Sequence, residues 1–249
     1  MLLVVLVLIF LPPLWWVVYK SQRRLPVTPG GRCLLVIAHP DDETMFFGPT
    51  LLRLVESGIK IFVLSITNGN ADGLGSVRKK ELSSAIQKLG ISPDTLTILD
   101  MKDYPDGFVK WETEKLARII LQYIEMLDCD CAITFDSCGV SRHPNHISCF
   151  SALQYLYTNG LLPTDVQVFV LETVRIFRKY SSVLDLLLTS LRSTFFNVSS
   201  PKDVLAIYAA MRQHKSQLVW FRYLYLVFSR YVFVNSLKRI PIHRYYSKK

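Results

Sequence analysis

Residues 32–46 read Arg-Cys-Leu-Leu-Val-Ile-Ala-His-Pro-Asp-Asp-Glu-Thr-Met-Phe, and they define a strand with polar residues at its end. Leu34 to Ile37 is an unbroken aliphatic run, the pattern of a strand buried on both faces of a parallel sheet. Pro40 ends the strand, because proline cannot donate a hydrogen bond to the ladder. Ligands bind at the carboxyl ends of strands in open α/β sheets. The predicted functional site therefore contains the polar residues at this end: His39, Asp41, Asp42 and Glu43.

A second polar cluster, His143-Pro144-Asn145-His146, follows another apolar run, Cys131 to Phe135. Either cluster alone is more typical of a loop with capping carboxylates or of a histidine hydrogen-bonded in a core. Two such clusters, each at the end of a buried strand, favour a metal site. Zinc takes imidazole and carboxylate ligands and, in catalytic sites, keeps one position for water.

The residue types assign roles within this predicted site. His39 and Asp42 lie three residues apart on one turn and can bind one ion, and His146 is the natural third ligand. Asp41 is adjacent to a ligand and suits a general base that takes a proton from water. His143 suits a hydrogen-bond donor to the oxyanion of a tetrahedral intermediate.

Strands and helices alternate through the first two-thirds of the chain. Apolar runs predict strands at 33–38, 60–67, 96–99, 131–135 and 166–171, and helical periodicity predicts helices at 45–57, 76–89, 112–127 and 145–158. In the helix at 112–127, apolar residues recur with the i, i+3, i+4 spacing of one buried face. Alternation with short connections predicts a doubly wound, mostly parallel, Rossmann-like α/β sheet.

The alternation fades after Thr173. A helix is predicted from Pro201, with Ser200 as its cap. The segment 218–234 is aromatic and apolar, but Arg222 and Arg230 disfavour a membrane span, at about 2.5–3.5 kcal/mol each on insertion scales. Two interpretations stay open for this segment: a helix of the core, or an aromatic, basic face that lies on a bilayer.

Residues 1–19 carry no charged side chain, and a run of this length spans a hydrocarbon core of about 30 Å. We therefore predict an N-terminal transmembrane helix over 1–19, a basic linker over 20–31 and a catalytic domain over 32–249. The basic residues that follow the span predict a cytosolic domain. A cleaved signal peptide is the alternative, but the segment lacks a basic n-region and a small-x-small cleavage site.

The bulk composition fits this division. A chain of 249 residues suits one large α/β domain with an appendage, and its net charge of +9 favours anionic partners such as nucleic acid, phosphorylated ligands or an anionic membrane. The five cysteines form no C-x-x-C pair, which favours a reducing compartment over a disulfide framework.

The motifs Ala38-His39-Pro40-Asp41-Asp42-Glu43 and His143-Pro144-Asn145-His146 resemble the PIG-L/LmbE family of zinc-dependent N-deacetylases. The similarity runs from about residue 33 to 237 and includes Arg78-Lys79-Lys80-Glu81-Leu82. The tail from His214 to Arg222 is similar to the eukaryotic branch, the N-acetylglucosaminyl-phosphatidylinositol de-N-acetylases of GPI-anchor biosynthesis.

This resemblance implies an LmbE-like fold and hydrolysis of the acetamide of GlcNAc-phosphatidylinositol. The partners it implies are this glycolipid and the endoplasmic reticulum membrane, which the chain would cross once with its catalytic domain in the cytosol; nucleic acid is not implied. The cofactor is Zn2+, although such ligands also suit other divalent ions. The implied residues are His39, Asp42 and His146 for zinc, Asp41 as base, His143 for the oxyanion, and Arg78 and His214 for substrate binding.

Three alternatives stay open. A nucleotide-dependent sugar transferase on the same sheet would need a glycine-rich phosphate cradle, for which Gly73-Leu74-Gly75 is only a weak candidate. A non-catalytic, membrane-anchored binding subunit could retain the fold, although every proposed ligand is present. A bacterial-type deacetylase of soluble sugars would share the chemistry, and the apolar N-terminus argues against it.

Overall fold

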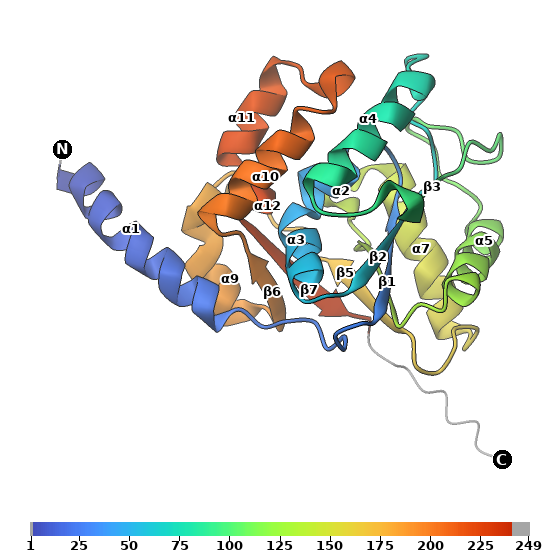
Figure 1. The fold of residues 1–249 in the computed structure, drawn as a ribbon, viewed down its shortest axis with the longest axis horizontal. Helices are drawn as coiled ribbons and strands as arrows, with labels where there is room; N and C mark the ends of the chain where they lie inside the picture. Colours follow the sequence, from blue (N-terminus) through green and yellow to red (C-terminus); the bar gives the residue numbers. More distant parts are fainter. Residues whose placement is uncertain (1, 241–249) are drawn as a thin grey trace.

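The structure is a computed structural model that describes residues 2–240, with side chains described from residue 11 onward. Its centre is a seven-stranded sheet with the order β3-β2-β1-β4-β5-β7-β6 (Figure 1). The strands are β1 (Arg32–Ile37), β2 (Lys60–Ser65), β3 (Leu96–Ile98), β4 (Cys131–Phe135), β5 (Gln167–Leu171), β6 (Phe195–Val198) and β7 (Val234–Arg239). The first five strands pair in parallel, and β7 pairs antiparallel with both β5 and β6.

Helices pack around this sheet. The helices that match predicted ones are α4 (Gly75–Lys88), α5 (Thr113–Met126), α7 (Pro144–Thr158) and α10 (Pro201–Met211). The predicted helix at 45–57 is divided into α2 (Asp42–Phe46) and α3 (Gly48–Glu56), and the short helix α6 (Gly139–Arg142) was not predicted. Helix α10 packs on α3 and α4, whereas α5 packs on α7. The predicted doubly wound, mostly parallel α/β fold is confirmed.

The adjacency of β1 and β4 positions the functional site. Cys33 of β1 lies opposite Cys131 of β4, and Leu35 lies opposite Ile133. Apart from Arg32 these strands are buried, as the uninterrupted aliphatic runs predict. Because β1 and β4 run parallel, the polar residues that follow them meet at one edge of the sheet.

The C-terminal third differs most from the sequence prediction. The segment 218–234 is neither one core helix nor one surface helix: α11 (Trp220–Phe228) ends at Ser229, and α12 (Arg230–Phe233) follows at once. Ser229 adopts an extended backbone and accepts a hydrogen bond from the N–H of Tyr231, which caps the second helix. Helix α12 is buried, while α11 exposes much of its apolar surface. The antiparallel strands β6 and β7 were not predicted.

Half of the predicted transmembrane helix over residues 1–19 lies outside the residues whose side chains the structure describes, so the membrane span stays a prediction. Among the residues that the structure describes, no helix combines the length and the apolarity that crossing a bilayer requires. The C-terminal half of helix α1 (Leu2–Ser21) contacts the domain: Val18 is buried against Leu186 and Phe196, and Trp15 Nε1 donates to the carbonyl oxygen of Ser199 at 2.9 Å. Met1, the side chains of residues 2–10 and residues 241–249 of the predicted domain lie outside the described residues.

A buried ion pair fixes the elements between β5 and β6, which include α8 (Ile176–Lys179) and α9 (Leu186–Arg192). Asp185 accepts two hydrogen bonds from Arg178, at 2.6 and 3.0 Å, and its Oδ2 lies 2.9 Å from Nε of Arg230. Asp185 and Arg230 are both buried, so each charge depends on its partner for compensation.

We expect Asp185→Asn to lower the free energy of unfolding by about 3–5 kcal/mol, because it leaves the guanidinium of Arg230 buried without a counter-charge. Chemical denaturation followed by circular dichroism measures the change. Glu112→Gln is the matched control: it removes an exposed partner 3.0 Å from Lys115, and we expect a loss of at most about 1 kcal/mol. Equal losses for the two variants would contradict the account of the Asp185–Arg230 pair.

Candidate active site

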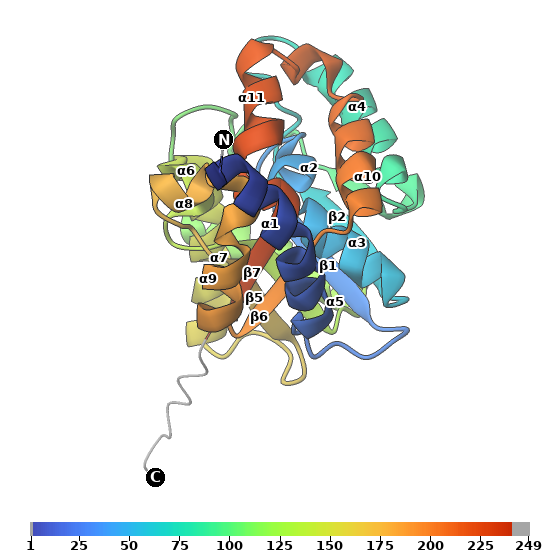
Figure 2. The same cartoon turned by 90° about the vertical axis from the view of Figure 1, so that its left-hand side faces the viewer.

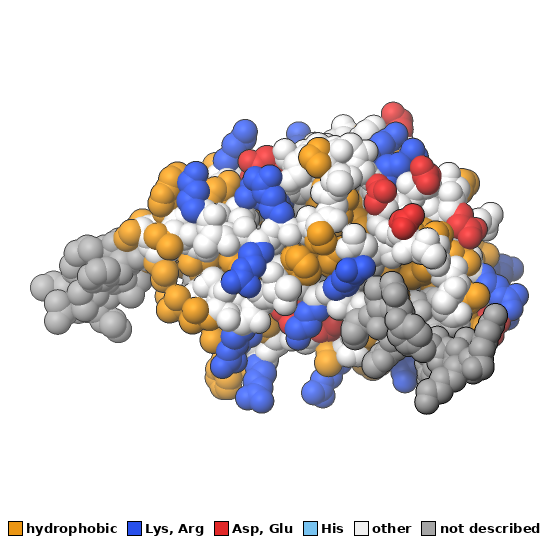
Figure 3. Space-filling view, turned by 90° about the horizontal axis from the view of Figure 1, so that it is seen from below, with side chains coloured by type: hydrophobic (Ala, Val, Ile, Leu, Met, Phe, Trp, Pro, Cys, Tyr) orange, Lys and Arg blue, Asp and Glu red, His pale blue; other side chains and the backbone are white. Residues whose placement is uncertain are grey.

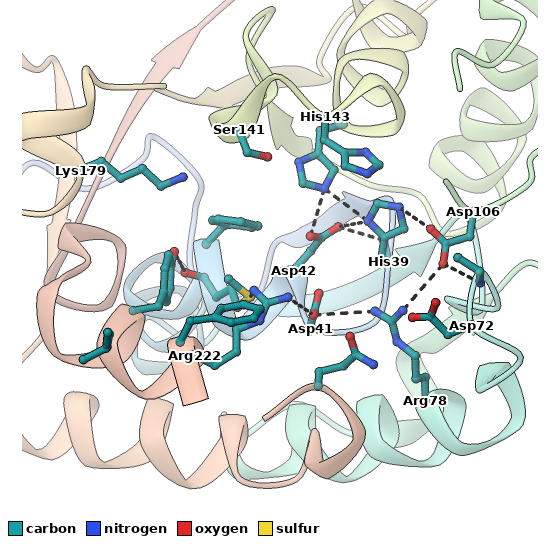
Figure 4. A pocket seen from close by; sticks show the side chains of 18 of the residues that line it. His39, Asp41, Asp42, Asp72, Arg78, Asp106, Ser141, His143, Lys179 and Arg222 are labelled. Atoms are coloured by element: carbon teal, nitrogen blue, oxygen red, sulfur yellow. Dashed lines mark hydrogen bonds and ion pairs between the residues drawn. The ribbon is translucent and has the colours of Figure 1, made fainter. Parts of the chain in front are cut away.

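The site lies in a cavity of about 870 Å3 at the carboxyl edge of the parallel strands (Figure 4). His39 and Asp42 follow β1, and His146 lies in the first turn of α7, shortly after β4. Helix α11 contributes much of the opposite wall. The structure therefore brings the two predicted clusters into one cavity.

Three side chains converge at the floor of this cavity. His146 Nε2 lies 3.1 Å from Asp42 Oδ1 and 3.3 Å from His39 Nδ1, and His39 Nδ1 lies 3.5 Å from Asp42 Oδ2. Ligand atoms placed about 2.1 Å from a tetrahedral ion lie about 3.4 Å from one another. The spacing of these three side chains thus fits one shared ion.

The outward nitrogens of both histidines also have partners. His39 Nε2 lies 2.9 Å from Asn145 Oδ1 and 3.1 Å from Asp106 Oδ1, and His146 Nδ1 lies 3.0 Å from the carbonyl oxygen of Gly139. Histidines that bind metals usually donate their second N–H to a carboxylate or carbonyl, which fixes the tautomer. These contacts leave His39 Nδ1 and His146 Nε2 as the ligand atoms, and the donor set fits a divalent metal.

Asp42 is held as a carboxylate. Its Oδ2 accepts hydrogen bonds from the backbone N–H groups of Ala38 and His39, at 3.1 and 2.8 Å. Burial by itself raises the pKa of Asp42, but the charges and hydrogen bonds of His146 and His39 outweigh burial and hold the pKa well below its usual value. The carboxylate therefore stays ionised, as a metal ligand requires.

His143 lies beside this set rather than within it. Its ring centroid is 4.8 Å from that of His39 and 4.9 Å from that of His146, and a nitrogen of each histidine lies within 4.8 Å of the others. Three histidines can therefore also hold an ion. However, His143 Nδ1 accepts a hydrogen bond from the N–H of Asn145, which in the neutral ring leaves the proton on Nε2. Burial, then the charge of His39, lowers the pKa of His143 to about 4, so the ring is a neutral donor at pH 7.

Asp41 lies next to the proposed ligands in an unusual backbone conformation. Its φ of 111° is in the region that non-glycine residues seldom adopt, and its N–H donates to Glu43 Oε2 at 3.0 Å. The side chain faces two cations: Oδ2 lies 3.2 Å from Arg222 Nη2 and 3.7 Å from Arg78 Nη2. Burial raises the pKa of Asp41, although the guanidinium of Arg222 opposes that shift. A carboxylate with a raised pKa beside a metal site suits a base.

Arg78 lies in the cavity wall, as the predicted substrate contact requires. Its guanidinium donates to the carbonyl oxygens of Pro40 and Gly69, at 2.6 and 3.0 Å, so it joins the loops that follow β1 and β2. Gly69 has a φ of 74°, and a Cβ there would lie 2.5 Å from the Arg78 Cζ atom. Only glycine fits this close approach.

His214 lies one layer below the cavity and does not line it. It is fully buried, and its Nε2 lies 2.7 Å from Glu43 Oε1, while Glu43 in turn accepts the N–H of Asp41. His214 does not reach the cavity in this structure, and its predicted role in substrate binding stays a prediction. Its contacts instead place it as a support for the backbone of Asp41.

Three further residues that line the cavity were not predicted as site residues, namely Asp106, Lys179 and Arg222, and neither was Asn145, which is buried behind His39. Asn145 lies inside the second motif, where its spacing from the histidines was the available signal. Asp106 and Lys179 lie in ordinary polar segments, and only the fold brings them to the site.

The fold and the site define the class of the protein: it is an α/β protein with a histidine-rich site, able to hold a metal, at the carboxyl edge of its sheet. Residues 34–157 match the family described as PIG-L: GlcNAc-PI de-N-acetylase. The chain is 42% identical, over 220 residues, to the N-acetylglucosaminyl-phosphatidylinositol de-N-acetylase of Bos taurus, which covers 87% of this chain and 86% of the relative.

Two further comparisons agree. Over 229 residues the chain is 44% identical to a probable N-acetylglucosaminyl-phosphatidylinositol de-N-acetylase of Schizosaccharomyces pombe, covering 88% of this chain and 90% of the relative. The solved N,N'-diacetylchitobiose deacetylase of Pyrococcus horikoshii shares the fold, with a TM-score of 0.61 over 84% of each chain at 15% identity. The chain belongs to the PIG-L family of GlcNAc-PI de-N-acetylases.

Metal binding is expected to release a proton from His39. Burial lowers the pKa of this imidazole, but hydrogen bonds with Asp106 and Asp42 outweigh burial and raise the pKa to about 10. Without a metal, His39 is therefore protonated at neutral pH, whereas a metal ligand has to be deprotonated. We expect an affinity for zinc that rises with pH up to about 10.

Titration calorimetry of zinc binding, in buffers of different ionisation enthalpy, measures the released protons. Asp106→Asn removes the hydrogen bond that contributes most to the raised pKa, so this variant should release fewer protons per ion than the wild type. Asp94→Asn, at an exposed carboxylate, serves as the control. Proton release that is unchanged in Asp106→Asn would contradict the assigned protonation of His39.

Proposed function

We propose that this protein is a zinc-dependent amide hydrolase. It removes the N-acetyl group of GlcNAc-phosphatidylinositol and forms GlcN-phosphatidylinositol and acetate, a step of GPI-anchor biosynthesis. The observation that carries the proposal is the convergence of His39 Nδ1, Asp42 and His146 Nε2 beside the carboxylate of Asp41. The names of the relatives in Bos taurus and Schizosaccharomyces pombe support this substrate.

Each proposed residue has a defined task. Zinc held by His39, Asp42 and His146 would supply Lewis acidity that makes water a stronger nucleophile at neutral pH. Asp41 accepts the proton of the attacking water, whose oxygen bonds to the acetyl carbonyl carbon. The carbon–nitrogen bond then breaks, and the proton passes to the departing amine, so that acetate and the free amine leave.

His143 faces the charge that develops on the carbonyl oxygen. Because its pKa is lowered to about 4, the ring is neutral at pH 7 and keeps the Nε2 proton for donation. A donor already in place for the oxyanion stabilises the tetrahedral intermediate without reorganising water.

Cations of the cavity suit the phosphate of the proposed glycolipid. Arg78, Lys179 and Arg222 all line the cavity (Figure 4). The cavity, at about 870 Å3, has room for a sugar and an inositol phosphate. Burial, then the charge of Arg222, lowers the pKa of Lys179. Binding an anion between these cations would relieve their mutual repulsion.

The proposed place of action is the cytosolic face of the endoplasmic reticulum membrane, where the glycolipid would be presented. A net charge of +9 suits a surface of anionic lipid, and the five cysteines, all free, suit a reducing compartment. The proposal does not depend on a membrane-spanning helix.

The two rivals from other functional classes are less well supported. A nucleotide-dependent transferase would need a glycine-rich phosphate cradle after β1, where the chain has histidine and three acidic residues. A non-catalytic binding subunit would have no need of a base with a raised pKa beside the proposed metal ligands.

We expect Asp41→Asn to reduce acetate release from GlcNAc-phosphatidylinositol by at least about a hundredfold, because the amide cannot accept the proton of water. Zinc content should be unchanged. Chelation should abolish wild-type activity, and added zinc should restore it. Asp94→Asn is the matched control and should retain full activity. Activity of Asp41→Asn within tenfold of the wild type would remove Asp41 from the role of base.

We expect His143→Gln to lower kcat by about a hundredfold to a thousandfold, the usual loss for one oxyanion donor. The bound zinc, measured by atomic emission, should stay at the wild-type stoichiometry, whereas His146→Gln should lose it. Loss of zinc from His143→Gln would assign His143 to the metal instead of to the oxyanion.

A further inference from the structure

One face of the molecule exposes large apolar side chains that no part of the described chain covers. They belong to α1, α8, α9 and α11 and to the turn before α9. Among the most exposed are Trp16 (61%), Ile176 (66%), Phe177 (88%), Leu184 (63%), Leu191 (75%) and Trp220 (73%). We call these elements and their exposed residues the apolar face. Soluble monomers seldom expose contiguous apolar patches of this kind without a partner.

The elements of the apolar face are neighbours. Figure 2 shows α1 crossing the front of the molecule, with α8 and α9 to one side and α11 above. Two contacts confirm the continuity: Val18 of α1 packs on Leu186 of α9, and Ser182 Oγ donates to the carbonyl oxygen of Val227 in α11. In the view from below, hydrophobic side chains gather at the end of the molecule where α1 and α9 lie, while basic side chains spread over the rest (Figure 3).

The charge of the apolar face has one sign. Helices α1, α8, α9 and α11 contain no acidic residue. The one acid of the turn between α8 and α9 is Asp185, which is buried and paired with arginines. Lys20, Arg175 and Arg192 are exposed at the edges of the face. Apolar side chains with a basic border match the interface of a bilayer that contains anionic lipid.

The apolar face is continuous with the mouth of the cavity. Trp220, Leu224 and Phe228 of α11 are exposed, by 73%, 50% and 49%, and they also line the cavity. Lys179 and Tyr180, at the end of α8, line the cavity as well. A surface that lay against this face would therefore deliver a lipid headgroup to the cavity, with the acyl chains left in the bilayer.

We infer that the apolar face docks on an anionic lipid bilayer, with Phe177, Leu191 and Trp220 inserted among the lipids and the basic residues at the headgroups. This rests on the proposed function for the identity of the substrate, but the docking itself can be measured without activity. Docking by this face explains how a substrate held in a membrane reaches a cavity at the end of a β-sheet.

The direct test places a fluorescent probe on the face. In the full chain with the exposed Cys138 replaced by serine, Phe177→Cys is labelled with an environment-sensitive dye and mixed with vesicles of phosphatidylcholine and phosphatidylinositol. We expect a blue shift and quenching by doxyl-labelled lipid. Met126→Cys is the control, because Met126 is 63% exposed on α5, toward the opposite end of the molecule from α1 (Figure 1). Quenching at both positions, or at neither, would overturn the docking face.

A charge variant then links docking to turnover. Ile176→Asp/Phe177→Asp should weaken vesicle binding and reduce kcat/KM on vesicle-borne GlcNAc-phosphatidylinositol at least about tenfold, since a charged side chain loses the favourable burial of an apolar one in the bilayer. Turnover of the water-soluble deacylated headgroup should stay within twofold, because neither residue lines the cavity. Met126→Asp should behave as the wild type in both assays.

The outcomes separate the two proposals. Wild-type protein that fails to turn over the soluble headgroup would contradict the proposed function, while the quenching result still decides the docking face. If the wild type does not bind vesicles, the inference is overturned. Equal losses on soluble and vesicle-borne substrate would also overturn it, because the variant would then disturb the cavity.

Discussion

The site depends on the parallel pairing of β1 with β4. This pairing places the end of one buried strand beside the end of another that lies about a hundred residues later in the chain. As a result, His39 and Asp42 from the first strand end and His146 from the second approach to between 3.1 and 3.5 Å. No local segment could assemble this set. The long-range strand order does so, and the aliphatic strands that enforce the order are the most buried part of the molecule.

Burial of so many ionisable groups is possible because they compensate one another. Asp42 and Asp106 lie on either side of His39. Arg78 and Arg222 lie beside Asp41. Below them, Glu43 pairs with His214. A buried charge without a partner would be too costly to keep ionised. The different surroundings shift the pKa values of the proposed base Asp41, the proposed ligand Asp42 and the proposed donor His143 differently, although all three line one cavity.

The sequence was sufficient for the parallel part of the fold and for the grouping of the site. Short runs of apolar residues identify β1, β2, β4 and β5, because parallel strands buried on both faces consist mostly of aliphatic residues. Pro40 and the polar residues after it mark the end at which ligands bind. The motifs then predicted that His39, Asp42, His143 and His146 would meet, and they do.

The rest of the fold depends on tertiary contacts that leave no local pattern. Strands β6 and β7 are short and pair antiparallel at the sheet edge, and Ser229 divides an aromatic run that looks continuous in sequence. The apolarity of residues 1–19 did not indicate that Trp15 and Val18 pack α1 on the domain. His214 resembled a substrate contact by motif, but its burial beneath Glu43 follows only from the packing of the chain segment after α10.

The central claim is that one divalent metal lies between His39, Asp42 and His146. Anomalous diffraction at the zinc edge, from crystals of the zinc-loaded protein, tests this claim most directly. The account predicts a single strong peak about 2.0–2.2 Å from His39 Nδ1, Asp42 Oδ1 and His146 Nε2, with His143 outside the coordination shell. A peak that His143 coordinates while Asp42 lies outside the shell would contradict it.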